Sequence, residues 1–180
     1  MKTHGAPLVD TVPGDIETWC PAYAGHGPEK RAEFWVGLMS ALAKHESTWR
    51  PEAVGGGGKW YGLTQILPAT ARGYGCKARS GAALKNGAAN LSCAVRIMAT
   101  TVARDNAVAR KSNGRLGGVA ADWGPMVNAK KRREMAAWTR DQTYCRLLSS
   151  VRPSERPAGL AAELVTRNAP ALGGVGSTSD

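Results

Sequence analysis

The sequence lacks the residue spacings that metal and phosphate sites need. Its four cysteines form no Cys-x-x-Cys pair, and its three histidines are scattered at His4, His26 and His45. Structural zinc sites use closely spaced Cys and His ligands, so we expect no metal ion and no other cofactor. A phosphate-binding glycine loop, an internal repeat and a strong strand pattern are also missing. We therefore expect a mainly helical fold with little or no sheet.

Long hydrophobic runs are missing and acidic residues are scarce. No run of about 18 apolar residues exists, so stable membrane insertion is not expected. The 24 Lys and Arg exceed the 14 Asp and Glu, which gives a formal net charge of +10. This charge predicts an anionic polymer as partner, either nucleic acid or an acidic cell-wall glycan. Charge alone leaves both open, but the RNP, zinc-finger and basic-zipper signatures of nucleic-acid proteins are absent, so we expect no nucleic acid partner.

Phenylalanine is nearly absent, whereas the other aromatic residues are not. The chain has one Phe beside six Trp and four Tyr. Trp offers a flat apolar face with a polar edge, which suits sugar rings, although Trp also packs cores. With 180 residues, 43% hydrophobic and 21% charged, the chain is long enough to bury a core of its own. We expect one main domain and a monomer.

Composition divides the chain into three parts. Residues 1–27 are rich in Pro and Gly and are interpreted as an extended N-terminal arm, pinned to the domain by Trp19, Cys20 and Tyr23. Residues 28–152 carry the helical patterns and form the main domain. Residues 153–180 shift to Pro, Ala, Gly and Ser and predict a poorly packed tail.

The main domain is organised around Glu46, at the end of a helix expected from Pro28 to about Ser47. An apolar stripe recurs along this helix at helical spacing, at Trp35, Leu38, Met39 and Leu42. Glu46 follows Leu42 by four residues and falls on the same stripe. Partial desolvation there would raise the pKa of Glu46, as a general acid near neutral pH requires. The alternative is a helix-end Glu that points to solvent.

Three later segments frame this helix. The Gly-rich segment Val54–Lys59 is either a mobile flap beside a cleft or a plain linker. A second amphipathic helix is expected over residues 88–109, with Asn90 near its start, where Asn is most often an N-cap. The basic cluster Lys130–Arg133 is interpreted as the solvated face of a third helix.

The four cysteines predict two disulfides in an oxidising compartment. Three pairings exist, and we favour Cys76–Cys93 around a Gly-rich loop and Cys20–Cys145 between the N-terminal segment and the last helix. The alternative is four reduced, buried thiols.

Taken together, four blocks resemble the soluble lytic transglycosylase family, which has a goose-type lysozyme fold. The resemblance covers about residues 28–150. Its blocks are His45-Glu46-Ser47, the run Tyr61-Gly-Leu-Thr-Gln-Ile-Leu-Pro-Ala-Thr-Ala71, Asn90-Leu91, and Tyr144-Cys145. The sequence departs from the family at Thr64, where Met is usual, and at Ala121-Asp-Trp-Gly-Pro125, where Tyr-Asn-Ala-Gly-Pro is usual.

The resemblance implies a lytic transglycosylase that cleaves the β-1,4 bond between N-acetylmuramic acid and N-acetylglucosamine in peptidoglycan. Glu46 would protonate the leaving oxygen and then take a proton from the muramoyl C6 hydroxyl, which closes a 1,6-anhydro ring without water. A wall substrate implies a periplasmic or extracellular location. No hydrophobic signal region follows Met1, so we expect a signal that was removed, or another route such as a holin or a phage particle.

The same resemblance assigns roles around Glu46. Ser47 would hydrogen-bond Glu46 or the substrate, or merely close the helix end. Tyr61 and Gln65 would line the cleft, with simple packing as the alternative for Tyr61. Asn90 would bind the sugar's acetamido group or the chain near Glu46, and Tyr144 would hydrogen-bond within the active site.

Two other functions stay open on the sequence. The first is a water-using muramidase on the same fold, because ordinary glycosidases use two carboxyl groups. Its second carboxylate would be Asp122 or another of the acids outside the matched blocks: Glu52, Asp105, Glu134 and Asp141. The second is a non-catalytic wall-binding module whose basic surface supplies the affinity.

Overall fold

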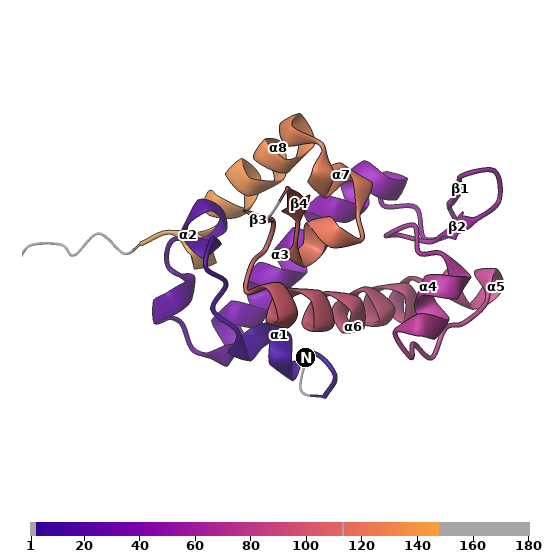
Figure 1. Cartoon of the computed structure of the whole chain (residues 1–180), viewed down its shortest axis with the longest axis horizontal. Helices are drawn as coiled ribbons and strands as arrows, with labels where there is room; N and C mark the ends of the chain where they lie inside the picture. The colour runs from indigo at the N-terminus through magenta and orange to yellow at the C-terminus, as the bar shows by residue number, and fades with distance from the viewer. Residues whose placement is uncertain (1–2, 113, 148–180) are drawn as a thin grey trace, which may run out of the picture. The chain divides into compact units, whose positions relative to one another are not determined.

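The computed structural model describes residues 3–112 and 114–147, which are built on two long helices, α3 (Pro28–Ser47) and α6 (Gly87–Asp105) (Figure 1). The shorter helices are α1 (Ala6–Asp10), α2 (Ile16–Trp19), η1 (Tyr23–Gly25), α4 (Pro68–Gly73), α5 (Gly81–Leu84), η2 (Gly118–Ala121), α7 (Gly124–Val127), α8 (Ala129–Arg140) and η3 (Thr143–Cys145). The strands form two small antiparallel hairpins, β1 (Val54–Gly55) with β2 (Trp60–Tyr61) and β3 (Lys111–Ser112) with β4 (Arg115–Leu116). The predicted mainly helical class is confirmed. The predicted tail at 153–180 lies outside the described residues.

Helix α3 has the predicted bounds and the predicted buried face. Pro28 lies in its first turn, where the missing N–H group has no partner within the helix in any case. The stripe is inside the core, with Trp35, Leu38 and Leu42 fully buried. Thr48 and Trp49 then adopt left-handed φ angles of 53° and 56°, so the helix ends sharply at Ser47.

Helix α6 differs from the expectation at both ends. The residue that caps it is Asn86, whose side chain accepts a hydrogen bond of 2.9 Å from the N–H of Ala89. Asn90 is therefore not the N-cap but a residue inside the first turn. The helix stops at Asp105, before the predicted residue 109, because Asn106 takes a left-handed conformation (φ 46°).

The N-terminal segment is not the extended arm that its Pro and Gly content suggested. It folds into α1, α2 and η1, and α1 packs on α6 and α3. The apolar side chains Leu8 and Trp19 are buried, and the indole of Trp35 donates a 2.8 Å hydrogen bond to the hydroxyl of Tyr23. Burial of these apolar groups outweighs the weak local helix propensity. Trp19, Cys20 and Tyr23, the residues expected to anchor the segment, are all buried.

Two disulfides join distant parts of the described chain. Cys20 is bonded to Cys145 and Cys76 to Cys93, which are the pairings favoured by the sequence. They close loops of 125 and 17 residues. In the chain-entropy model such loops stabilise by about 5 and about 3 kcal/mol, respectively.

The Gly-rich segment Val54–Lys59 is neither a plain linker nor wholly irregular. Val54 pairs with Tyr61 and Gly55 with Trp60, so the segment forms one arm and the turn of a hairpin. Gly56, Gly57 and Gly58 make the turn with positive φ angles, which glycine adopts without steric cost.

Across the described chain, no helix combines the length and the apolar character that crossing a membrane would require.

Candidate active site

Glu46 lies in the last turn of α3, half-buried. Burial raises the pKa of Glu46 to about 7, because the carboxylate loses solvation that the neutral acid does not need. Among the described residues, no hydrogen bond contributes to this pKa. A carboxyl group that is half protonated near pH 7 is suited both to donate and to accept a proton.

Lys131 is the charged group that acts on Glu46. It belongs to α8, which packs on α3, and its positive charge lowers the pKa of Glu46 against the larger effect of burial. The sequence pattern predicted for Lys131 only a solvated face, with a share in the electrostatic attraction of the wall, and no role beside Glu46. In the sequence, Lys131 is one of four consecutive basic residues, and no pattern indicated that this run would pack near the end of α3.

Ser47 is directed at the backbone and not at its neighbour Glu46. Its buried hydroxyl lies 2.8 Å from the carbonyl oxygen of Leu63 and 3.2 Å from that of Ala43. Both groups are acceptors, so the hydroxyl proton is committed to one or the other. The expected hydrogen bond to Glu46 is not formed. Ser47 instead fastens the end of α3 to the turn over residues 62–66.

Asn90 binds the same turn from the first turn of α6. Its side chain is fully buried, and its Oδ1 accepts from the N–H and the hydroxyl of Thr64 at 3.0 and 2.7 Å. Its Nδ2 donates to the carbonyl oxygens of Tyr61 and Leu84 at 2.9 and 3.0 Å. With every polar atom engaged, Asn90 is not available to a sugar acetamido group. Its position fits the other expected role, which is to hold the chain near Glu46.

The turn over residues 62–66 requires glycine at position 62. The φ of Gly62 is +80°, and a Cβ atom there would collide with the carbonyl oxygen of Leu84 and with Nδ2 of Asn90. A side chain at this position would therefore break the Asn90 contacts as well as strain the backbone.

Gln65 and Tyr61 connect the turn to the β1–β2 hairpin. Gln65 has a φ of 49°, and its amide donates to the carbonyl oxygens of Ala53 and Gly62 at 3.2 and 2.9 Å. The hydroxyl of Tyr61 donates to the carbonyl oxygen of Gly58 at 2.6 Å. Both side chains thus support the backbone, and their contact with substrate stays a prediction.

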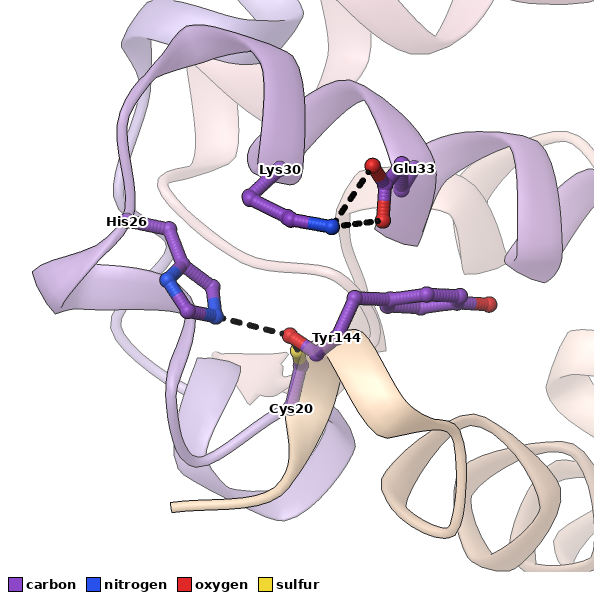
Figure 2. A network of polar contacts seen from close by, with 5 residues as sticks. All are labelled: Cys20, His26, Lys30, Glu33 and Tyr144. Atoms are coloured by element: carbon purple, nitrogen blue, oxygen red, sulfur yellow. Dashed lines mark hydrogen bonds and ion pairs between the residues drawn. The ribbon is translucent and has the colours of Figure 1, made fainter. Parts of the chain in front are cut away.

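The structure does not bring Tyr144 to Glu46. The ring of Tyr144 lies against Gly37, where a Cβ atom would collide with its hydroxyl. Gly37 precedes Glu46 by two and a half turns, which is about 13 Å along the helix. The carbonyl oxygen of Tyr144 accepts a 2.8 Å hydrogen bond from Nε2 of His26, and its ring points away from that contact (Figure 2). A direct hydrogen bond from Tyr144 to Glu46 is therefore excluded in this structure.

The other candidate carboxylates have partners of their own or lie in solvent. Asp105 binds Arg104 at 2.6 Å, Asp122 accepts from the hydroxyl of Tyr74 at 3.2 Å, and Glu134 faces His45 at 3.7 Å. Asp141 pairs with Arg146, and Glu52 is exposed. In the described chain, none of these acids contributes to the pKa of Glu46. The same residues contain no cluster of three or more His, Cys, Asp or Glu placed to hold a metal ion.

Comparison with known proteins decides the family. The family described as Transglycosylase SLT domain matches residues 26–121, more than half of the chain. The chain belongs to this family. Its members are lytic transglycosylases that act on peptidoglycan, and this chain is an enzyme of that class. The matched region contains Glu46, Ser47, Tyr61, Gln65 and Asn90 and ends before Tyr144.

Solved structures confirm the fold. The wild-type form of Bd0314 DslA is 27% identical, with a TM-score of 0.71 over 79% of this chain and 84% of its own. Two DslA mutants in which a glutamate is replaced by glutamine match over the same shares, with identities of 27% and 25% and TM-scores of 0.72 and 0.71. No curated protein matches the chain. A wall substrate and two disulfides together indicate that the enzyme works outside the cytoplasm.

Two departures of this transglycosylase from its family pattern lie in direct contact. The indole of Trp123 donates a 2.9 Å hydrogen bond to the carbonyl oxygen of Thr64. Thr64 is itself fully buried and bonded to Asn90. The hydrogen bond from Trp123 therefore attaches the turn over residues 62–66 to the start of α7.

Proposed function

We propose that Glu46 is the single general acid and base of this transglycosylase, and that it cleaves the MurNAc-β-1,4-GlcNAc bond with formation of a 1,6-anhydro-muramoyl end. The observation that supports this most is the burial that raises the pKa of Glu46 to about 7. At that pKa the group is an acid strong enough to protonate a leaving oxygen and a base strong enough to deprotonate a hydroxyl.

The reaction proceeds in two proton transfers at one carboxyl group. As the bond from the muramoyl C1 to the GlcNAc O4 breaks, protonated Glu46 gives its proton to O4. The muramoyl C6 oxygen then forms a bond to C1, and the C6 hydroxyl proton passes to the carboxylate of Glu46. Glu46 ends protonated, as it began, and no water is consumed. Lys131 stabilises the carboxylate in the interval between the two transfers.

The muramidase alternative receives less support from the site. It requires a second carboxylate roughly 5–10 Å from the first to activate water or attack the sugar. Asp105, Asp122, Glu134 and Asp141 are engaged with other groups, and within the described residues no acid perturbs Glu46.

The test combines one substitution with the mass of the product. Glu46→Gln keeps the shape of the side chain but removes the transferable proton, so release of soluble fragments from purified peptidoglycan should fall at least about 100-fold. Glu52→Gln, an exposed acid six residues later, is the matched control and should keep parental activity. Mass spectrometry of the parental products should find ends lighter by one water than a hydrolysed end.

Two results would contradict the proposal. Activity of Glu46→Gln within about twofold of the parent would remove Glu46 from the mechanism. Hydrolysed reducing ends from the parent would keep Glu46 as the acid but establish a muramidase.

We further propose that the enzyme acts as a monomer without cofactor or nucleic acid, in the periplasm or outside the cell.

A further inference from the structure

A hollow lies between α3 and α8, and Glu46 is not among the residues that line it. It has a volume of about 120 Å³, and the α3 residues that line it include Ala41 and Lys44. At 100° per residue, Ala41 and Lys44 lie roughly on the opposite side of α3 from Glu46. This hollow is therefore a separate feature of the molecule.

Two half-exposed indoles flank the hollow. Trp49 is 52% exposed and Trp138 is 45% exposed, although burial of such large apolar faces is normally favourable. Trp49 is fixed in place, because its backbone has the left-handed φ of 56° and its indole donates a 2.9 Å hydrogen bond to the carbonyl oxygen of Ser40. Trp138 lies on α8 beside Gly37 of α3, close enough that a Cβ atom on Gly37 would be in van der Waals contact with its ring. Both rings thus stay half-exposed in the part of the chain that the structure describes, and the ring of Trp49 is held by its hydrogen bond.

The rim of the hollow is polar and balanced in charge. Ser40 and Lys44 line it from α3, and Glu134 lines it from α8 with its carboxylate 3.7 Å from Nε2 of His45. Burial lowers the pKa of His45, so its imidazole is neutral at pH 7 and both donates and accepts hydrogen bonds. One cation and one anion cancel, which suits a neutral, hydroxyl-rich ligand better than the carboxylates of a stem peptide.

The floor of the hollow is apolar, and its size limits what can enter. Ala41 and Met135 form this floor. The volume of the hollow, about 120 Å³, is well below the roughly 300–1,000 Å³ of pockets that enclose a drug-sized ligand. That space admits one small group, such as an acetamido group, while a sugar ring attached to it rests outside on an indole face.

We propose that this hollow is a second glycan-binding site, which takes an N-acetylhexosamine residue of the peptidoglycan strand. The sugar ring stacks on Trp138 or Trp49, the acetamido methyl contacts the apolar floor, and the rim binds the amide and hydroxyl groups. The ligand class rests on the proposed function, since it is the polymer that Glu46 cleaves. The site holds the enzyme on the glycan without taking part in the cleavage.

The experiment titrates the whole protein with di-N-acetylchitobiose and follows the indole N–H signals by NMR. The signals of Trp49 and Trp138, identified by their loss in single Trp→Ala variants, should shift, and cellobiose, which lacks acetamido groups, should not shift them. Trp138→Ala should weaken binding at this site at least about tenfold, and Trp138→Phe, which keeps a ring, should weaken it less. Trp60→Ala is the control, because Trp60 is 47% exposed on the hairpin outside the hollow.

Several outcomes would overturn this site. Equal shifts with cellobiose would remove the acetamido recognition, and shifts of neither indole would remove the site. A change in oligomeric state in Trp138→Ala without loss of sugar binding would make this face an interface between copies of the chain. Thermal unfolding verifies that each variant is folded. The titration needs no turnover, so failure of Glu46→Gln to lose activity would overturn the proposed function alone.

Discussion

At the scale of single residues, Glu46 is set by two opposed effects of known sign. Burial favours the neutral acid, and the charge of Lys131 favours the carboxylate; burial is the larger. The balance places the pKa of Glu46 at about 7, where a small change in either effect alters the protonated fraction strongly. A substitution of Lys131 should therefore change the pKa of Glu46 without changing Glu46 itself.

This balance predicts the pH dependence of activity. Cleavage requires protonated Glu46 at its first step, so the rate should fall as pH rises through about 7. Lys131→Ala removes the opposing charge and should move that fall to higher pH. Lys130→Ala, the neighbouring lysine with no effect on the pKa of Glu46, is the control and should leave the profile unchanged. Rates of peptidoglycan solubilisation across neutral pH measure all three proteins.

The raised pKa of Glu46 also makes the free energy of unfolding depend on pH. The folded pKa of about 7 exceeds the ordinary value of 4.5, so the folded state binds more protons between these values. The contribution is present below about pH 4.5 and is lost as pH rises to about 7. After a discount for partial exposure it amounts to about 2 kcal/mol. Urea unfolding should show Glu46→Gln gaining that much on the parent as pH rises across this window; a gap independent of pH would contradict the raised pKa.

At the scale of elements, the turn over residues 62–66 is held between the two long helices. Ser47 binds it from the end of α3, and Asn90 binds it from the first turn of α6. Within the same turn, the amide of Gln65 donates a hydrogen bond to the carbonyl oxygen of Ala53, the residue directly before the β1–β2 hairpin. Most of the residues that match the family blocks, namely Ser47, Gln65 and Asn90, therefore have a structural role. Their hydrogen bonds hold the hairpin in a fixed position relative to the end of α3, where Glu46 lies.

Two asparagines four residues apart at the start of α6 allow this interpretation to be tested. Asn90→Ala would remove the partner of the buried N–H and hydroxyl of Thr64 and of the carbonyl oxygen of Leu84, which should cost about 3 kcal/mol or more. Asn86→Ala removes only an exposed N-cap and should cost about 1 kcal/mol. Chemical denaturation measures both free energies of unfolding. If Asn90→Ala costs no more than Asn86→Ala, Asn90 does not support the turn.

The elements that the sequence predicted are those whose signal is local. The stripe of Trp35, Leu38 and Leu42 predicted α3 and the burial of Glu46, because a helix places residues by a fixed rotation. The N-terminal segment was misjudged, because its helices form only when Leu8 and Trp19 find α3 and α6. The contacts of Lys131 and Tyr144 also depend on how α8 and η3 pack, which no local pattern in the sequence specifies.

At the scale of the whole molecule, part of the positive charge lines one groove. A groove of about 1140 Å³ is bordered by β3–β4, the end of α6, η2 and α7, and its cations are Arg104, Arg110, Lys111, Arg115 and Arg132. Asp105, which also borders it, is bonded to Arg104. The groove therefore concentrates several cations on one face of a chain whose net charge is +10.

This charge predicts that binding to intact cell wall weakens with salt. Stem peptides and attached polymers of the wall are anionic, and exposed charges are screened beyond about 8 Å at physiological salt. Binding of Glu46→Gln protein to wall sacculi should therefore fall steeply between about 50 and about 500 mM salt, and the double variant Arg110→Ser, Arg115→Ser should show a shallower fall. Cleavage of a short uncharged glycan, if it is a substrate, should barely change, because Glu46 acts apart from these cations. A nucleic-acid protein would instead bind DNA far more tightly than wall fragments, with an equally steep salt dependence. That result, or wall binding independent of salt, would contradict electrostatic attraction to the wall as the role of the charge.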